Sequence, residues 1–66
     1  MKDLVRLIEL LMINEKELKE SFEKKDNNFD FNDLLIIRDY YYELQKEKSD
    51  YFKDYCYYDN LINELQ

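Results

Sequence analysis

The chain of 66 residues contains no glycine, proline, histidine or tryptophan, and Cys56 is its only cysteine. Glycine and proline form many β-hairpin turns and sharp loops, so their absence favours helices joined by short polar connections. The same absence excludes the glycine-rich loops that bind phosphate groups. A single cysteine cannot form a disulfide within one chain, and without histidine a zinc site of the Cys/His type is excluded.

The missing residues also argue against catalysis. Histidine is the most common proton-transfer group in active sites, and neither Ser21 nor Ser49 is accompanied by a base that would activate its hydroxyl. A chain of this length is also expected to lack room for a pocket of ordinary ligand size. We therefore expect a non-enzymatic protein with no cofactor and no metal ion.

The length predicts a single helical domain, residues 1–66, with a small core. At this size only roughly 60% of the surface of the unfolded chain is buried on folding, so stability is marginal. Because disulfides and zinc are excluded, regular helix packing or association with a partner must supply the remaining stability.

Charge is distributed unevenly along the chain, whose net charge is −6. Residues 1–25 contain six basic and six acidic side chains, whereas residues 26–66 contain four basic and ten acidic ones. An acidic surface repels nucleic acids and anionic lipids, so we expect neither direct nucleic-acid binding nor membrane binding. A protein partner with a basic surface is favoured, including one that normally holds nucleic acid.

Apolar runs are short. Leu7–Ile13 is interrupted by Glu9 and is far too short to span a bilayer, so we expect a cytoplasmic protein, in its own cell or in an infected host. Residues with AT-rich codons (Lys, Tyr, Asn, Ile, Phe and Met) make up 32 of the 66, which indicates a low-GC source such as a bacterium, its phages or an AT-rich virus.

The spacing of apolar residues predicts a first helix over about residues 3–25. Its apolar positions recur at steps of three and four residues: Leu4, Leu7, Ile8, Leu11, Leu18 and Phe22. Between Leu4 and Ile13 the apolar arc is wider than one neighbouring helix requires, which indicates contact with two neighbours.

Residues 26–30, DNNFD, predict a turn, because Asn and Asp side chains bond nearby backbone groups. Asp30 suits the N-cap of the following helix, and Asp33 suits its positive first turn. A nearly regular heptad then follows: Leu34, Ile37, Tyr41, Leu44, Lys48, Tyr51, Tyr55, Tyr58, Ile62 and Leu65. This pattern is typical of a helix in a coiled-coil-like bundle.

Lys48 interrupts the heptad, and Ser49 and Asp50 follow it. In one interpretation a new helix begins here, which gives a small antiparallel all-α bundle with later helices over about residues 31–48 and 50–65. In the other, these two segments form one continuous long helix, and the resulting hairpin dimerises because its tail overhangs the first helix. The wide apolar arcs favour the compact bundle, and the continuous helix remains an alternative.

All seven tyrosines lie between Arg38 and Asn60. The heptad predicts that one set faces the core, where tyrosine packs well if its hydroxyl reaches water or a partner: Tyr41, Tyr51, Tyr55 and Tyr58. Exposed rings are typical of interfaces. Four aromatic residues lie off this stripe and are the candidate aromatic partner-binding residues: Tyr40, Tyr42, Phe52 and Tyr57. The alternative interpretation is that they make a second packing contact within the protein.

The candidate acidic partner-binding residues follow one another at steps of four, three and four: Glu43, Glu47, Asp50 and Asp54. On a continuous helix they would share one face at a spacing of roughly 4.5–6 Å along the axis, comparable with the phosphates of a nucleic-acid strand. Such a row would fit a basic groove; the simpler interpretation is a solvated helix face. A bend at residues 48–50 would divide the row.

Together these features predict a small acidic protein-binding module. The first hypothesis is an inhibitor or antagonist that binds a basic, nucleic-acid-handling protein through an acidic Tyr-rich helical face. In composition alone, the chain is similar to small acidic phage proteins that block restriction or CRISPR enzymes. The alternatives are a self-associating structural or regulatory helical hairpin, and an antitoxin or adaptor subunit that folds with its partner.

Overall fold

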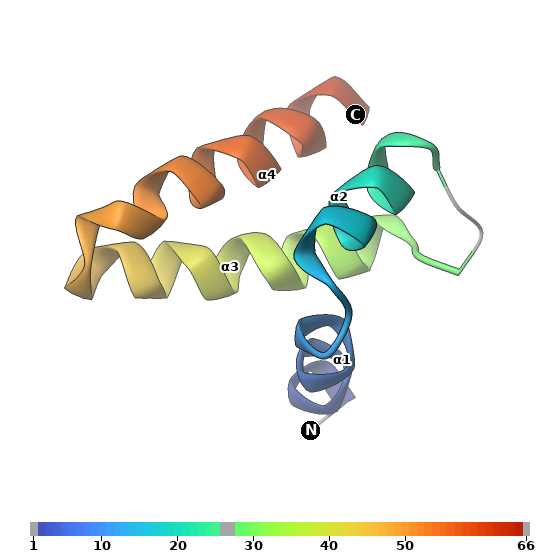
Figure 1. Ribbon diagram of the computed structural model, residues 1–66, viewed down its shortest axis with the longest axis horizontal. Coiled ribbons are helices and arrows are strands. Elements are labelled where there is room, and N and C mark those ends of the chain that lie inside the picture. Colours follow the sequence, from blue (N-terminus) through green and yellow to red (C-terminus); the bar gives the residue numbers. More distant parts are fainter. Residues whose placement is uncertain (1, 26–27, 66) are drawn as a thin grey trace.

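The protein is an all-α bundle, as the missing turn residues and the apolar spacing predict. A computed structural model describes residues 2–25 and 28–65. Its elements are α1 (Lys2–Leu11), α2 (Glu15–Glu23), α3 (Phe31–Glu47), the short 3-10 helix η1 (Ser49–Tyr51) and α4 (Phe52–Leu65). In Figure 1, α3 and α4 run antiparallel beside each other, α2 lies near the end of α4 that carries the C-terminus, and α1 lies on the other side of α3.

The predicted first helix over residues 3–25 is wrong as a single element, because α1 ends at Leu11 and α2 begins at Glu15. Asn14 is the N-cap of α2, with backbone angles φ −56° and ψ 129° that lie outside the helical region. Its side-chain oxygen accepts hydrogen bonds from the backbone N–H groups of Lys16 (2.9 Å) and Glu17 (3.4 Å). These bonds satisfy donors that have no partner within the new helix, so Asn14 stabilises a break that the apolar spacing conceals.

The N-terminus of α3 agrees with the sequence prediction. Asp30 is the N-cap, and its side chain accepts a 3.0 Å hydrogen bond from the backbone N–H of Asp33. The Asp33 carboxylate in turn accepts a 3.1 Å bond from the backbone N–H of Asp30, which completes a capping box. Both carboxylates also lie at the positive end of the helix dipole.

The chain bends at Lys48, so the compact bundle is correct and the continuous long helix is wrong. Lys48 has φ −135° and ψ 111°, an extended conformation that ends α3 before η1 begins. The bend brings α4 back along α3, where the rings of Tyr41 and Tyr58 stack at 5.6 Å and 8°. The tail therefore packs on the hairpin and does not overhang it.

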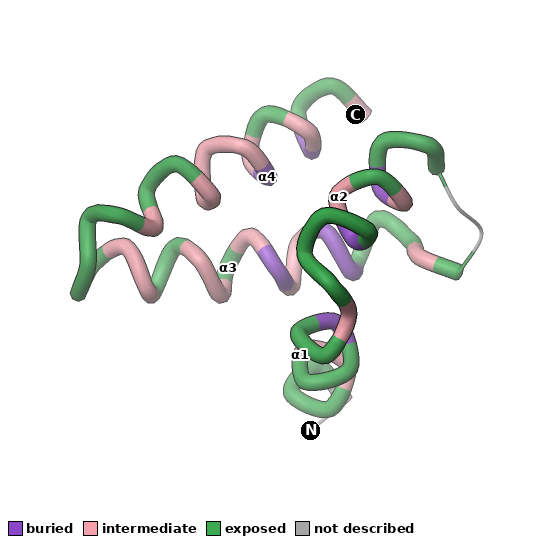
Figure 2. Tube along the Cα trace, in the orientation of Figure 1, coloured by how far each residue is buried: buried purple, intermediate pink, exposed green. Residues whose placement is uncertain are grey.

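A small core joins the four α-helices. Its buried side chains are at most 4% exposed, and they come from every one of these helices: Leu10, Leu18, Phe22, Leu34, Ile37, Tyr58 and Ile62. In Figure 2 these buried residues lie where the helices face one another, and most of α1 is exposed. With so few buried side chains, each one contributes a large part of the stability.

Candidate functional site

The bend at Lys48 divides the predicted acidic row. Glu43 and Glu47 are exposed on α3, one helical turn apart. Asp50 is exposed in η1, whereas Asp54 lies on α4. The four carboxylates therefore do not form one continuous helix face, and the comparison with a strand of evenly spaced phosphates no longer applies.

Asp54 belongs to the contact between α4 and α2. Its carboxylate lies 3.5 Å from the Lys19 ammonium, and its side chain is only 27% exposed. Lys19 also lies 3.2 Å from the carboxylate of Glu15, so it joins two acidic side chains. Asp54 thus stabilises the packing of the bundle rather than extending the exposed acidic surface.

The two exposed rings of the predicted aromatic set lie near the bend. Tyr42 is 42% exposed and Phe52 is 51% exposed. Both pack against the same third ring, Tyr55, with centroid distances of 5.3 Å and 6.2 Å. The Lys46 ammonium lies 4.6 Å from the centroid of the Tyr42 ring, a cation–π contact that holds this ring at the surface.

Exposed carboxylates accompany these rings. The Glu43 side chain is 71% exposed and lies 3.5 Å from the Lys46 ammonium, an arrangement that contributes little to stability because both groups are solvated. Five exposed side chains near the bend form what we call the acidic aromatic end: Tyr42, Glu43, Glu47, Asp50 and Phe52.

The other two predicted aromatic residues, Tyr40 and Tyr57, pack against the core. The Tyr40 ring lies 5.2 Å from the Tyr41 ring, edge to face. The Tyr57 hydroxyl donates a hydrogen bond to the Glu23 carboxylate, and the Lys19 ammonium lies 4.8 Å from the Tyr57 ring centroid. Tyr57 therefore joins α4 to α2, and burial together with the bond to Glu23 raises the pKa of its hydroxyl.

The inner tyrosines are buried to different degrees. Tyr58 is fully buried, whereas Tyr41, Tyr51 and Tyr55 are half-buried. Burial raises the pKa of Tyr41 to about 12, and it also raises the pKa of Tyr58. The Tyr58 hydroxyl has no hydrogen-bond partner among residues 2–25 and 28–65. Tyr41 and Tyr58 thus act as packing groups of the bundle.

A second exposed surface, which the apolar spacing alone does not mark as a candidate site, lies on α1 and the residue that follows it. The side chains that we call the α1 face are Leu4 (53% exposed), Val5 (58%), Ile8 (51%), Leu11 (41%) and Met12 (81%). The wide apolar arc predicted two neighbours for this segment. Within the described part of the chain, the core side of α1 packs on α3 through the buried Leu10, and its outer side stays uncovered.

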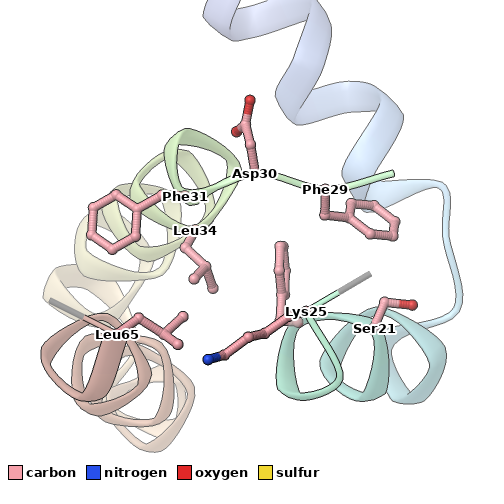
Figure 3. Close-up of a pocket in the computed structure, with 8 residues that line it drawn as sticks. Ser21, Lys25, Phe29, Asp30, Phe31, Leu34 and Leu65 are labelled. Atoms are coloured by element: carbon pink, nitrogen blue, oxygen red, sulfur yellow. The ribbon is translucent and has the colours of Figure 1, made fainter. Parts of the chain in front are cut away.

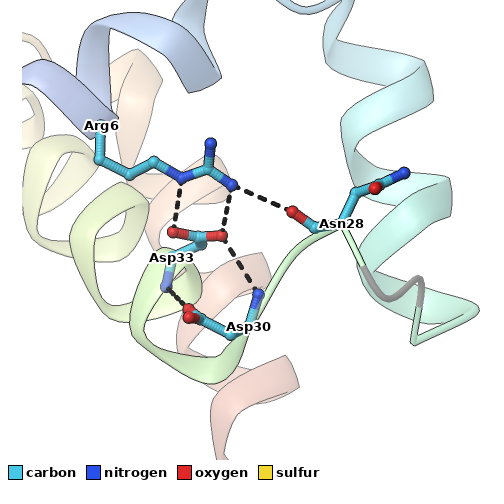
Figure 4. A network of polar contacts seen from close by, with 4 residues as sticks. All are labelled: Arg6, Asn28, Asp30 and Asp33. Carbon is cyan, nitrogen blue, oxygen red and sulfur yellow. Dashed lines mark hydrogen bonds and ion pairs between the residues drawn. The ribbon is translucent and has the colours of Figure 1, made fainter.

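A bidentate ion pair fixes the orientation of α1 (Figure 4). Nε and one terminal nitrogen of Arg6 each donate a 2.8 Å hydrogen bond to the Asp33 carboxylate, and the same terminal nitrogen donates a 3.1 Å bond to the carbonyl oxygen of Asn28. Asp33 is only 4% exposed, and the neighbouring guanidinium lowers the pKa of its carboxyl. Because Arg6 points toward α3, the α1 face points away from the core.

A cavity of about 390 Å³ lies between the end of α2, the start of α3 and the end of α4. Figure 3 shows the Lys25 side chain reaching across it. The residues that line it are mainly apolar: Ser21, Phe22, Lys25, Phe29, Asp30, Phe31, Leu34 and Leu65. The depression is partly open to solvent, so its volume does not make it an enclosed ligand pocket, and the expectation that the chain lacks room for one stays a prediction.

The surroundings of the cavity offer apolar contact and two charged groups. Lys25 has φ 58°, a left-handed conformation that glycine usually adopts but that this chain, which has no glycine, gives to a lysine.

Within residues 2–25 and 28–65, no three His, Cys, Asp or Glu side chains are grouped so that they could hold a metal ion. None of the described helices is long and apolar enough to cross a membrane.

The chain was compared with known proteins. No protein-family model, curated protein or solved structure matches it, so the two exposed surfaces are interpreted from their own residues.

Proposed function

We propose that the protein is a non-enzymatic protein-binding module and that its acidic aromatic end binds a basic surface of another protein. One observation carries this proposal: Tyr42 and Phe52 remain exposed near the carboxylates of the bend. Aromatic rings at a surface supply contact area at low entropic cost, and interface cores are enriched in them. The neighbouring carboxylates supply the charge that selects a basic partner.

The charge distribution supports the same mode of recognition. Residues 26–66 contain the whole net charge of −6, and the bend lies in this part of the chain. At the bend itself the exposed Lys46, Lys48 and Lys53 balance Glu43, Glu47 and Asp50, so the attraction of a basic surface, and the faster association that it gives, rest on the net negative charge of residues 26–66 as a whole. In this mode the carboxylates act as a cluster around exposed rings, without the regular spacing of a phosphate backbone.

The proposed role is that of an inhibitor or antagonist. A basic groove that normally holds nucleic acid is a suitable target, because the acidic aromatic end would compete there with phosphate groups. The place of action that we propose is the cytoplasm, in the protein's own cell or in a host infected by a phage or virus, as for anti-defence proteins. The abundance of residues that AT-rich codons encode supports such a source.

Affinity capture with matched charge variants tests this proposal. The chain is immobilised, exposed to an extract of its native host, and the bound proteins are identified by mass spectrometry. We expect a basic protein that is retained by the wild type and lost by the double variant Glu43→Lys/Glu47→Lys. The control, Glu20→Lys/Glu64→Lys, changes the net charge equally but lies on exposed positions of α2 and α4 away from the bend. Equal loss of the partner in both variants would contradict recognition by the acidic aromatic end.

The small core supports a second candidate, an antitoxin-like or adaptor subunit that completes its folding on a partner. Only seven hydrophobic side chains are buried among the described residues. A chain with so small a core is marginally stable alone. Circular dichroism of the isolated chain distinguishes the two roles: a broad, non-cooperative melt favours the adaptor, whereas a sharp cooperative melt excludes it.

A further inference from the structure

The α1 face has the spacing of a helix-packing seam. Leu4, Ile8 and Leu11 follow one another at steps of four and three residues, and Val5 and Met12 widen the seam on one side. This is the repeat by which one amphipathic helix packs along another. In Figure 2 the outer part of α1 is exposed, whereas the buried residues of α3 and α4 lie against other helices.

The exposed area of this seam is sufficient for a weak dimer. The five side chains are between 41% and 81% exposed, which corresponds to an apolar patch on the order of 400 Å². Two such patches bury roughly 800 Å² together, and the polar rim brings the total near 1,000 Å², the lower limit for a specific interface. A patch of this size on a monomer is usually functional.

The charge around the seam favours a second copy over a basic partner. None of the five side chains is charged, and residues 1–25 sum to a net charge of zero. Two chains of net charge −6 repel each other wherever residues 26–66 meet, so α1 is where they can approach at least electrostatic cost. An identical apolar seam is also self-complementary under twofold symmetry.

We propose that two copies of the chain associate through their α1 faces, with the two α1 helices antiparallel and the Ile8 side chains meeting at the twofold axis. Ile8 lies midway between Leu4 and Met12, so an antiparallel pair brings Leu4 of each copy against Met12 of the other. The α1 helices are about 15 Å long. An antiparallel pair holds the two acidic bodies at opposite ends, whereas a parallel pair would place them side by side.

Sedimentation equilibrium over about 5–500 μM tests the association, because interfaces near 1,000 Å² are typical of weak complexes. We expect the wild-type mass to rise with concentration toward twice the 8.3 kDa of one chain, with a dissociation constant of about 1–100 μM. Ile8→Lys should raise this constant at least about tenfold, because dimerisation would bury two lysines. The control Phe52→Lys replaces another apolar side chain that is also 51% exposed and should leave the constant unchanged.

A wild type that stays monomeric throughout this range overturns the proposal and would indicate that the α1 face binds a different protein. Dimerisation that Ile8→Lys does not weaken, or that Phe52→Lys weakens equally, overturns it too. Far-ultraviolet circular dichroism of each variant shows whether the helices are retained. The oligomeric state of the wild type does not bear on the acidic aromatic end, whose own test uses Glu43, Glu47 and a separate partner.

Cysteine cross-linking gives a positive signal for the antiparallel register, on a Cys56→Ser background that removes the free thiol. Ile8→Cys should form a disulfide-linked dimer under mild oxidation, because residues on the twofold axis lie close together. Met12→Cys should not, because the two Met12 positions lie about 12 Å apart along the axis, beyond the reach of a disulfide. A Met12→Cys dimer that forms as readily as the Ile8→Cys dimer would indicate a parallel pair and would overturn the antiparallel arrangement, as would the absence of an Ile8→Cys dimer.

Discussion

Tyr58 shows how a polar atom can be tolerated in a core as small as this one. Its ring is fully buried, stacks on Tyr41 at 5.6 Å and meets Phe22 edge to face at 6.2 Å. Its hydroxyl has no hydrogen-bond partner within the described part of the chain, so burial costs free energy that the ring contacts must offset.

Tyr58→Phe removes this buried hydroxyl and keeps the ring, so we expect an unchanged or higher free energy of unfolding, by up to about 1 kcal/mol. Tyr58→Ala removes the ring contacts as well and should cost about 3–5 kcal/mol, enough to unfold so small a domain. Urea denaturation followed by circular dichroism measures both. A loss of more than about 1 kcal/mol in Tyr58→Phe would mean that the hydroxyl is stabilised by an interaction of its own.

Lys25 has a left-handed backbone conformation that residues with a Cβ atom rarely adopt. Its φ of 58° costs a residue with a Cβ atom about 1–2 kcal/mol, and glycine avoids this cost. Lys25→Gly should therefore raise the melting temperature by a few degrees. The adjacent Lys24 has φ −85°, so the control Lys24→Gly should leave the melting temperature equal or lower. Thermal melts that show the same change in both variants would contradict strain at Lys25.

At the scale of elements, the connection between α1 and α3 depends on one ion pair. Arg6 and Asp33 make two 2.8 Å hydrogen bonds, and the Asp33 carboxylate also completes the capping box of α3. The Asp33 carboxylate thus caps the start of α3 and positions α1 through Arg6. Removing either partner is expected to free α1 and to weaken the start of α3 together.

The pair also makes a defined part of the stability depend on pH. The pKa of Asp33 is lowered in the folded state, chiefly by its hydrogen bonds to Arg6. Its contribution is therefore present above the ordinary carboxyl range near 4 and is lost as the pH falls through the lowered folded value. Asp33→Asn should lose about 1–3 kcal/mol at pH 7.

Urea denaturation at several pH values between about 2 and 7 measures this effect. The difference between wild type and Asp33→Asn should shrink at the acid end, where Asp33 is protonated in both states. Asp39→Asn is the control, since Asp39 pairs with Arg38 but is 71% exposed, and such a pair contributes little. A difference for Asp33→Asn that is constant with pH would contradict the ion-pair explanation.

The elements themselves were predictable to different degrees. Asp30 predicted the start of α3 because capping depends on local side chains, whereas residues 26 and 27 of the predicted DNNFD turn lie outside the described residues. The break at Asn14 was missed because apolar spacing continues across it, and an asparagine inside a helix differs little in propensity from many other residues. The sequence alone does not decide the bend at Lys48, because neither glycine nor proline marks it, and the packing of α4 on α3 selects it.

At the scale of the whole molecule, exposure depends on tertiary packing that spacing alone does not reveal. Tyr42 and Tyr57 both lie off the heptad stripe, yet Tyr42 is exposed and Tyr57 packs against α2. The apolar arc of residues 4–13 was visible in the sequence, but its missing second neighbour was not. If the α1 faces pair as proposed, each dimer presents two acidic aromatic ends, which would increase affinity for a partner with two basic sites.

Recognition of a basic protein through the acidic aromatic end is tested most directly by the association rate with the captured partner as a function of ionic strength. For the wild type, we expect this rate to fall steeply between about 0.05 and 0.5 M salt, because screening removes the long-range attraction. Glu43→Lys/Glu47→Lys should associate at least about tenfold more slowly at low salt and depend less on salt, whereas Glu20→Lys/Glu64→Lys should stay closer to the wild type. Equal rates and equal salt dependence in the wild type and Glu43→Lys/Glu47→Lys would contradict recognition by this surface.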